Sequence, residues 1–269
     1  ISQIMLYCRR FQTSFIERRI ALRIIYTDTY QNMSKEAAKI LAGQLWVKPD
    51  SVLGLATGST PVELYQNLVW LHEAVGLDFS EATSFNLDEY VGLPEGAPQS
   101  YHRFMRENLF DHVNIRKDHI FFPNGMAKDA DAEAARYEAA IAAAGGIDMQ
   151  LLGIGRNAHI GFNEPSDAFA RTTHKVVLKE STIEANSRFF SSPDEVPREA
   201  MSMGIGTIFH ARHIVLMASG AEKAEAVRDA VCGTITPRVP ASILQLHPQV
   251  TLIVDSEAGA LLRESSDTK

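Results

Sequence analysis

The sequence has few cysteines, no long apolar run and no basic excess. Its two cysteines, Cys8 and Cys232, are too few for a disulfide framework or a zinc cluster, so we expect a reduced, cytoplasmic protein. No apolar run reaches the roughly 18 residues of a membrane helix, which predicts no membrane partner. The net charge of -7 argues against a nucleic-acid partner, because phosphate-binding surfaces of that kind normally show a basic excess. A small phosphorylated metabolite remains compatible, since a few cations and backbone amides can hold one phosphate.

The residues that are present predict a single α/β catalytic domain over 23–262. From Leu22 onward, short apolar runs alternate with longer segments of helical period. This alternation predicts a three-layer αβα sandwich around a doubly wound, mostly parallel, Rossmann-like sheet. We expect strands at 23–26, 51–56, 82–87, 148–154, 174–178, 213–218 and 250–254, and helices near 32–46, 61–75, 99–110, 129–144, 197–209 and 221–231.

Two parts of the chain lie outside this alternation. Residues 1–22 form an N-terminal extension that is basic and poor in acids, typical either of a transit peptide or of a remnant of cloning or upstream translation. Residues 263–269 form a C-terminal tail.

The stretch 179–197 is the most polar and irregular interior region, and it is either a surface loop or part of a small mobile lid at about 171–203.

A glycine-containing loop follows the second expected strand. Thr57, Gly58, Ser59 and Thr60 lie between this strand and a helix whose first turn would contain Pro61. Backbone amides and hydroxyls at a helix N-terminus can hold a phosphate. Simple helix capping by Ser and Thr is the alternative.

Polar side chains follow two further expected strands. Asp88 comes just after the strand at 82–87, and GIGRNAHIGFNEP follows the strand at 148–154. Within that motif, His159 can move protons near neutral pH, and Glu164 can fix its tautomer. Each residue could also be an ordinary loop side chain. Because ligands of open α/β sheets bind beyond the carboxyl ends of the strands, we expect the three loops to converge on one cleft.

Two cations outside these loops could also bind a phosphate. Arg188 lies in the polar stretch, and Lys223 stands at the start of the helix after HIVLMASG. Arginine suits bidentate contacts and lysine a point-charge contact. The alternative for each is a solvated surface charge.

Several motifs together resemble the glucosamine-6-phosphate deaminase (isomerase) family. GLATGSTP, NLDEYVGLP, SYHRFM, GIGRNAHIGFNEP, ANSRFF and LQLHP occur in that family's order and spacing, from about Leu22 to Leu262. The resemblance implies conversion of glucosamine 6-phosphate and water to fructose 6-phosphate and ammonia, without a cofactor or a metal. The sequence itself has no zinc-like His/Cys spacing.

The resemblance also implies roles for individual residues. His159 would shuttle the proton that opens the sugar ring, with Glu164 orienting it, and Asp88 would take the proton from C2. The phosphate would be held by Thr57, Gly58, Ser59, Thr60, Arg188 and Lys223. Asn157 stands where many members carry an aspartate, and we expect it to hold the imidazole but not to balance its charge.

Regulation and rival functions complete these expectations. Allosteric members use basic residues after the FNEP segment and a C-terminal extension, whereas this chain has His174, Val176 and Val177 there and ends soon after Leu262. We therefore expect a monomer or a homo-oligomer rather than the allosteric hexamer.

The alternatives to a deaminase are a 6-phosphogluconolactonase-like hydrolase, which needs no Asp88, and a non-catalytic sugar-phosphate sensor. The sensor would need neither His159 nor Glu164, and the short N-terminal segment would be too small for its DNA-binding module.

Overall fold

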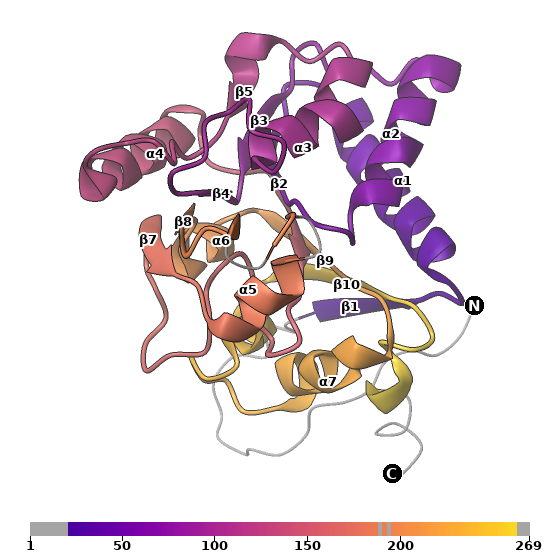
Figure 1. The fold of residues 1–269 in the computed structure, drawn as a ribbon. Coiled ribbons are helices and arrows are strands. Elements are labelled where there is room, and N and C mark those ends of the chain that lie inside the picture. Colours follow the sequence, from indigo (N-terminus) through magenta and orange to yellow (C-terminus); the bar gives the residue numbers. More distant parts are fainter. Residues whose placement is uncertain (1–20, 188–189, 193–194, 263–269) are drawn as a thin grey trace.

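A seven-stranded sheet forms the centre of the molecule (Figure 1). The structure is a computed structural model and describes residues 21–187, 190–192 and 195–262. The strand order is β1-β10-β9-β6-β2-β3-β5, and every pair of neighbours is parallel. The strands are β1 (Ala21–Tyr26), β2 (Val52–Leu55), β3 (Thr83–Asn86), β5 (Ile120–Phe121), β6 (Met149–Gly153), β9 (His213–Ala218) and β10 (Gln249–Val254).

Helices cover both faces of this sheet. Figure 1 shows α1 and α2 on one side of the sheet and α7 on the other. The helices are α1 (Tyr30–Val47), α2 (Val62–Val75), α3 (Tyr101–Asn108), α4 (Ala130–Ala143), α5 (Glu180–Asn186), α6 (Ile205–Phe209) and α7 (Ala224–Cys232). Short 3-10 turns lie at Phe110–His112, Lys117–His119, Ala221–Lys223 and Pro240–Leu246. No helix in the described ranges is long and apolar enough to cross a membrane.

Local sequence explains where these helices begin. Thr29, Ser100 and Asp129 precede α1, α3 and α4, and each side chain accepts a hydrogen bond from a backbone N–H of the first turn. The strands are apolar because both of their faces are covered, and Val215 and Leu252 are fully buried examples in β9 and β10. The expected α/β sandwich with its mostly parallel sheet is therefore confirmed.

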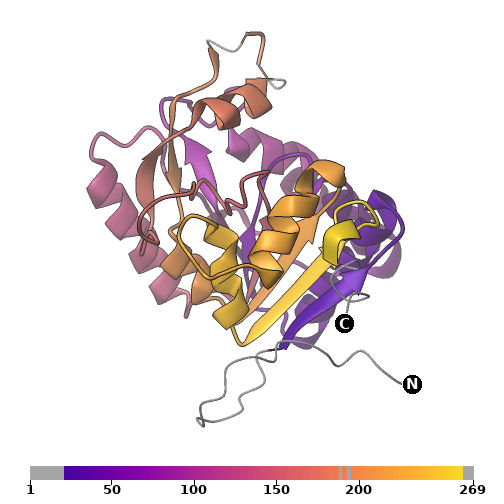
Figure 2. The ribbon, with the colours of Figure 1, turned by 90° about the horizontal axis from the view of Figure 1, so that it is seen from below.

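A second, smaller sheet lies beside the first. Its antiparallel order is β4-β8-β7, with β4 (Asp88–Tyr90), β7 (His174–Val177) and β8 (Glu199–Ser202). Tyr90, Phe162, Leu178, Ile183, Val196 and Ala200 form its own small apolar cluster. Figure 2 shows α5 at the opposite end of the molecule from β1 and β10.

Two expectations about this region were wrong. The strand at 174–178 exists as β7 but belongs to the antiparallel sheet, not to the parallel one. The single helix expected at 197–209 is instead β8 followed by the short α6. Gly204 separates the two, and a Cβ there would lie 2.3 Å from the carbonyl oxygen of Thr172. The backbone at Gly204 therefore lies so close to that at Thr172 that a residue with a side chain would not fit there.

Candidate active site

A cavity of about 980 Å³ opens beyond the carboxyl ends of the parallel strands. The loops after β2, β6 and β9 line it, together with Asp88 of β4, Tyr101 of α3 and part of α5. The structure thus brings together Thr57, Gly58, Ser59, Thr60, Asp88, Asn157, His159 and Lys223 on one surface. Glu164 lies behind that surface in contact with Asn157. Arg188 lies outside the described residues.

The loop at 57–60 has the shape expected of an anion cradle. Gly58 has φ +97°, in the left-handed region that glycine adopts without strain. The Tyr30 hydroxyl fixes the loop from α1 by donating to the carbonyl oxygens of Ser59 and Thr60 at 3.0 and 3.1 Å. The loop leads directly into α2, whose N-terminal backbone amides and dipole favour a negative group.

Lys223 lies on the same cavity from the other side of the sheet. Asp255 holds the loop before it by accepting hydrogen bonds from the Ser219 hydroxyl and from the backbone N–H of Gly220. Lys223 follows in a 3-10 turn, and its backbone N–H donates to the carbonyl oxygen of Gly220. The cavity therefore combines a loop of backbone donors with one lysine, a combination that can hold a phosphate.

Asp88 is a buried carboxylate with an unusually high pKa. Its side chain faces the cavity but is only 6% exposed. Burial, and after it the negative charge of Glu89, raise the pKa of Asp88 to about 8. No hydrogen bond to this carboxylate occurs among the described residues that would offset the cost of burial. A carboxylate in this state is a stronger base than an exposed aspartate.

His159, Asn157 and Glu164 form a connected relay. The Asn157 Oδ1 atom lies 2.7 Å from His159 Nδ1 and also accepts the backbone N–H of His159 at 3.3 Å. The Asn157 amide nitrogen donates to Glu164 Oε2 at 2.6 Å. Because an amide oxygen only accepts, Nδ1 must carry a proton, and in the neutral ring Nε2 is then the basic nitrogen.

Asn157 and Glu164 play different parts in the relay, as expected for an asparagine that holds the imidazole without balancing its charge. Glu164 Oε1 lies 3.6 Å from His159 Nδ1, which is too long for a good hydrogen bond but close enough for attraction between charges. Asn157 makes the direct contact that orients the ring. Glu164 supplies the negative charge, both through Asn157 and across this short gap.

Glu164 remains ionised although it is largely buried. Burial alone would raise its pKa, but the nearby imidazole of His159, with hydrogen bonds from Thr182 and Asn157, lowers the pKa to about 2. The Thr182 hydroxyl comes from α5 and donates to Glu164 Oε1. A stretch for which the sequence left a surface loop or part of a lid open therefore contains a helix, and this helix supplies one of the contacts that hold the relay.

The backbone of the loop fixes the imidazole in its place. A Cβ at Gly155 would lie 2.2 to 2.5 Å from three atoms of the His159 ring, so only glycine leaves room for the ring. Ala158 has φ 64°, a conformation that costs a non-glycine residue about 1–2 kcal/mol. Hydrogen bonds to Gly155 and from Ala241, both 3.0 Å, hold Ala158 there.

Sequence reasoning missed several residues of the cavity. Tyr101 lies on it, and its ring packs against Tyr90 on the strand of Asp88 with centroids 4.8 Å apart. The SYHRFM motif contains Tyr101, but the motif alone does not show where its side chains point. Tyr30 and Thr182 were missed because their contacts are 29 and 18 residues away in sequence.

Known proteins match the chain over most of its length. Residues 27–253 match the family described as glucosamine-6-phosphate isomerases/6-phosphogluconolactonase. Proteins named glucosamine-6-phosphate deaminase from Halothermothrix orenii and Clostridioides difficile are each 56% identical over 241 residues. These matches cover 90% of this chain and 100% and 97% of the two relatives, respectively.

Solved structures show the same fold. A monomeric glucosamine-6-phosphate deaminase superposes with a TM-score of 0.87 at 47% identity, covering 89% of this chain and all of the other. The 6-phosphogluconolactonase from Trypanosoma cruzi shares the fold, with a TM-score of 0.70 at 23% identity and coverage of 90% and 97%. Since the family match spans most of the described residues, the chain belongs to the glucosamine-6-phosphate isomerase/6-phosphogluconolactonase family.

Proposed function

We propose that this protein is a glucosamine-6-phosphate deaminase. The reaction takes glucosamine 6-phosphate and water to fructose 6-phosphate and ammonia. Relatives with that name are 51–56% identical to the chain over about 241 residues. The loop at 57–60 with Lys223 would bind the phosphate, and the rest of the cavity would receive the sugar.

His159 is proposed to open the sugar ring. Its basic Nε2 would accept the proton of the anomeric hydroxyl and deliver it to the ring oxygen as the bond between C1 and that oxygen breaks, which leaves an aldehyde at C1. The ring becomes positively charged during the transfer, and the Glu164 carboxylate, 3.6 Å from Nδ1, stabilises that charge. Asn157 keeps the ring in one tautomer throughout.

Asp88 is proposed to perform the isomerisation. As a carboxylate it would remove the proton from C2, giving an enolamine across C1 and C2, and would return the proton to C1. The product carries an iminium at C2, to which water adds before ammonia leaves. Water is consumed and ammonia is released, so the atoms balance without a redox partner. The raised pKa suits a group that must both take and return a proton near neutral pH.

One observation carries the proposal: a buried base with a raised pKa, a hydrogen-bonded proton relay and an anion-binding loop meet at the same cavity. Asp88 has no hydrogen-bond donor among the described residues and a pKa near 8, whereas His159 is held by an amide and a fixed carboxylate. A sensor that only binds a sugar phosphate requires the cradle and neither of these features. Lactone hydrolysis requires no base at C2.

A direct assay tests the proposal. Purified protein is incubated with glucosamine 6-phosphate, and ammonia and fructose 6-phosphate are measured by separate coupled enzymes. We expect the two products in equal amounts, and no hydrolysis of 6-phosphogluconolactone above the uncatalysed rate. Lactone hydrolysis without ammonia release would contradict the proposal and favour the rival hydrolase.

We further propose that activation by N-acetylglucosamine 6-phosphate is weak or absent and that the protein is a monomer or a small homo-oligomer. The segment after the relay carries His174, Val176 and Val177 in β7, and its one lysine, Lys175, is paired with Glu199 at 2.9 Å. Adding the acetylated sugar phosphate to the same assay, with size-exclusion chromatography alongside, tests this. Several-fold activation together with a hexamer would contradict it.

A further inference from the structure

Beside Asp88 in the sequence lies a second buried carboxylate, Glu89, with the opposite surroundings. Both residues are in β4, and successive side chains of a strand point to opposite faces. Asp88 faces the cavity, whereas Glu89 is 1% exposed and points to the start of α3. Nothing in the proposed reaction uses Glu89 directly.

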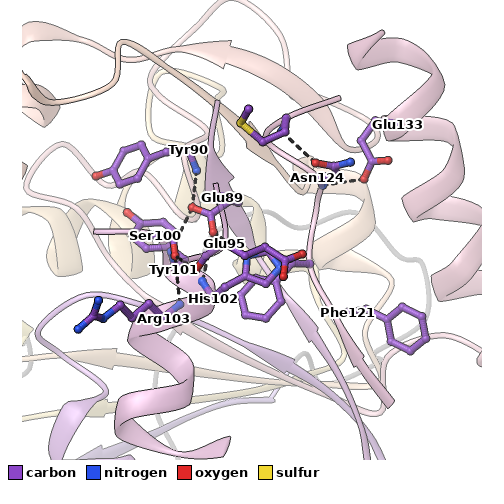
Figure 3. A network of polar contacts seen from close by, with 12 residues as sticks. Glu89, Tyr90, Glu95, Ser100, Tyr101, His102, Arg103, Phe121, Asn124 and Glu133 are labelled. Carbon is purple, nitrogen blue, oxygen red and sulfur yellow. Dashed lines mark hydrogen bonds and ion pairs between the residues drawn. The ribbon is translucent and has the colours of Figure 1, made fainter. Parts of the chain in front are cut away.

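Four hydrogen bonds hold the Glu89 carboxylate, as Figure 3 shows. Its Oε1 accepts the backbone N–H groups of Tyr90 at 2.8 Å and Tyr101 at 3.1 Å. Its Oε2 accepts the backbone N–H of His102 at 3.1 Å and lies 2.8 Å from His102 Nδ1. Two of these amides are the first of α3, where the helix dipole favours a negative charge. Four donors for one carboxylate keep its charge fixed in position.

His102 is itself held firmly. Its ring stacks on Phe122 with centroids 3.8 Å apart, and Nε2 lies 3.6 Å from Glu95, which is largely exposed. The imidazole thus lies between a buried and an exposed carboxylate. It is the only side chain that donates to Glu89 among the described residues, since the other three donors are backbone amides.

We propose that Glu89 and His102 act as positioning residues for Asp88: they fix β4 to the N-terminus of α3 and determine the negative charge that Asp88 experiences. The inference rests on the proposed function, in which Asp88 is the base. Glu89 supplies the charge, and His102 offsets part of it. Neither residue contacts the substrate in this proposal.

Other groups around Asp88 would be unchanged by variants of this pair. Besides Glu89, the titratable groups that interact electrostatically with Asp88 are Tyr90 on its own strand, Tyr101 of α3 and Tyr137 of α4, and His159 from the loop after β6 lines the same cavity. Burial raises the pKa of all three tyrosines, which are therefore neutral at working pH. On β8 the residue opposite Asp88 is Ser202, which does not titrate. The charged residues lining the same cavity are Arg156, Glu184, Glu222 and Lys223.

The pair predicts pH shifts of opposite sign. Removing the charge in Glu89→Gln makes ionisation of Asp88 easier, so the limb on which kcat/KM rises with pH should move to lower pH by roughly one unit. Removing the donor in His102→Phe leaves the Glu89 charge less compensated. The same limb should then move to higher pH by a smaller amount.

Two further variants separate this role from simple packing. His102→Phe keeps a ring against Phe122 but loses the donor, whereas His102→Asn keeps an amide donor near the position of Nδ1 and loses the ring. We expect His102→Asn to restore the wild-type position of the limb. Glu107→Gln is the matched control. It removes a carboxylate from α3, the helix of His102, where Glu107 forms an exposed ion pair with Arg103.

The experiment measures kcat/KM for ammonia release between pH 5 and about 10 for wild type and these variants, with circular dichroism as a check of folding. Opposite shifts for Glu89→Gln and His102→Phe support the inference. Coincident limbs, shifts in the same direction, or a His102→Asn limb displaced like that of His102→Phe would overturn it. Should Glu89→Gln fail to fold, the two His102 variants decide. A wild type without ammonia release would reject the proposed function itself, whereas an active wild type with unmoved limbs rejects only this inference.

Discussion

Two carboxylates of the candidate active site, Asp88 on the cavity and Glu164 behind it, have opposite surroundings in the fold. Both are largely removed from water. Asp88 receives no hydrogen bond among the described residues, and burial with the adjacent charge of Glu89 raises its pKa to about 8. Glu164 is also penalised by burial, but His159, Thr182 and Asn157 outweigh this and lower its pKa to about 2. Burial raises the pKa of both carboxylates, and of the two only Glu164 has donors and a neighbouring imidazole that outweigh it.

This difference corresponds to the two proposed tasks. A group that takes and returns a proton works best with a pKa near the working pH, as Asp88 has. A group that stabilises a transient imidazolium must stay negative at every working pH, as Glu164 does. Stability should depend on pH with opposite signs. The contribution of Asp88 is present below about pH 4 and is lost as pH rises towards about 8, whereas that of Glu164 is present above about pH 4.5 and is lost as pH falls towards about 2.

Asp88→Asn should have the largest effect on activity. The amide cannot take the C2 proton, so kcat for ammonia release should fall by roughly 10³–10⁴-fold, the upper part of the range for general base catalysis. Thermal unfolding should show the opposite trend. Relative to wild type, the variant should gain stability between about pH 4 and pH 8, because asparagine does not ionise.

Binding of glucosamine 6-phosphate and hydrolysis of a lactone, measured on Asp88→Asn, distinguish loss of the base from loss of substrate binding. The variant should still bind glucosamine 6-phosphate, because Asp88 is not part of the phosphate cradle. A lactone-hydrolysing protein would keep its rate, since lactone hydrolysis has no C2 proton to remove. Deamination at more than a tenth of the wild-type rate would exclude Asp88 as the base.

Glu164→Gln should reduce kcat by about 10²-fold, less than the loss at Asp88. The glutamine can still contact Asn157 and Thr182, but it cannot stabilise a charged His159. The variant should unfold at a lower temperature than wild type at pH 7, and this difference should disappear as pH falls towards about 2. Calorimetry between pH 3 and 7 measures this trend, and a constant difference across that range would contradict the lowered pKa of Glu164.

Much of this site could be predicted from the sequence because its parts are local. The strand at 51–56 ends in a loop with glycine, serine and threonine, and the strand at 148–154 ends in the relay motif. Parallel strands that end at one edge bring such loops together. The order of residues alone therefore predicted that these loops and Asp88 meet at one cavity.

The remaining features depend on contacts that the sequence does not encode locally. β8 was expected to be helical because the apolar residues of 197–209 also fit a helical period, and only its pairing with β4 and β7 selects a strand. Similarly, no local signal shows that the Thr182 hydroxyl reaches Glu164, since that depends on how α5 packs against the relay loop.

Thr182→Val should have the smallest effect of the three and tests how the donors of Glu164 lower its pKa. The change removes the α5 hydroxyl while it preserves the shape of the side chain, so kcat should fall by roughly fivefold, which corresponds to about 1 kcal/mol for one hydrogen bond. The acidic limb of the kcat profile should move to higher pH, because Glu164 then binds a proton more readily. Thr182→Ser should restore both. Thr207→Val is the control, since Thr207 donates to Glu138 at 2.7 Å and neither residue lines the cavity. Equal changes of the pH profile in Thr182→Val and Thr207→Val would show that loss of a buried hydroxyl, and not the contact with Glu164, causes the effect.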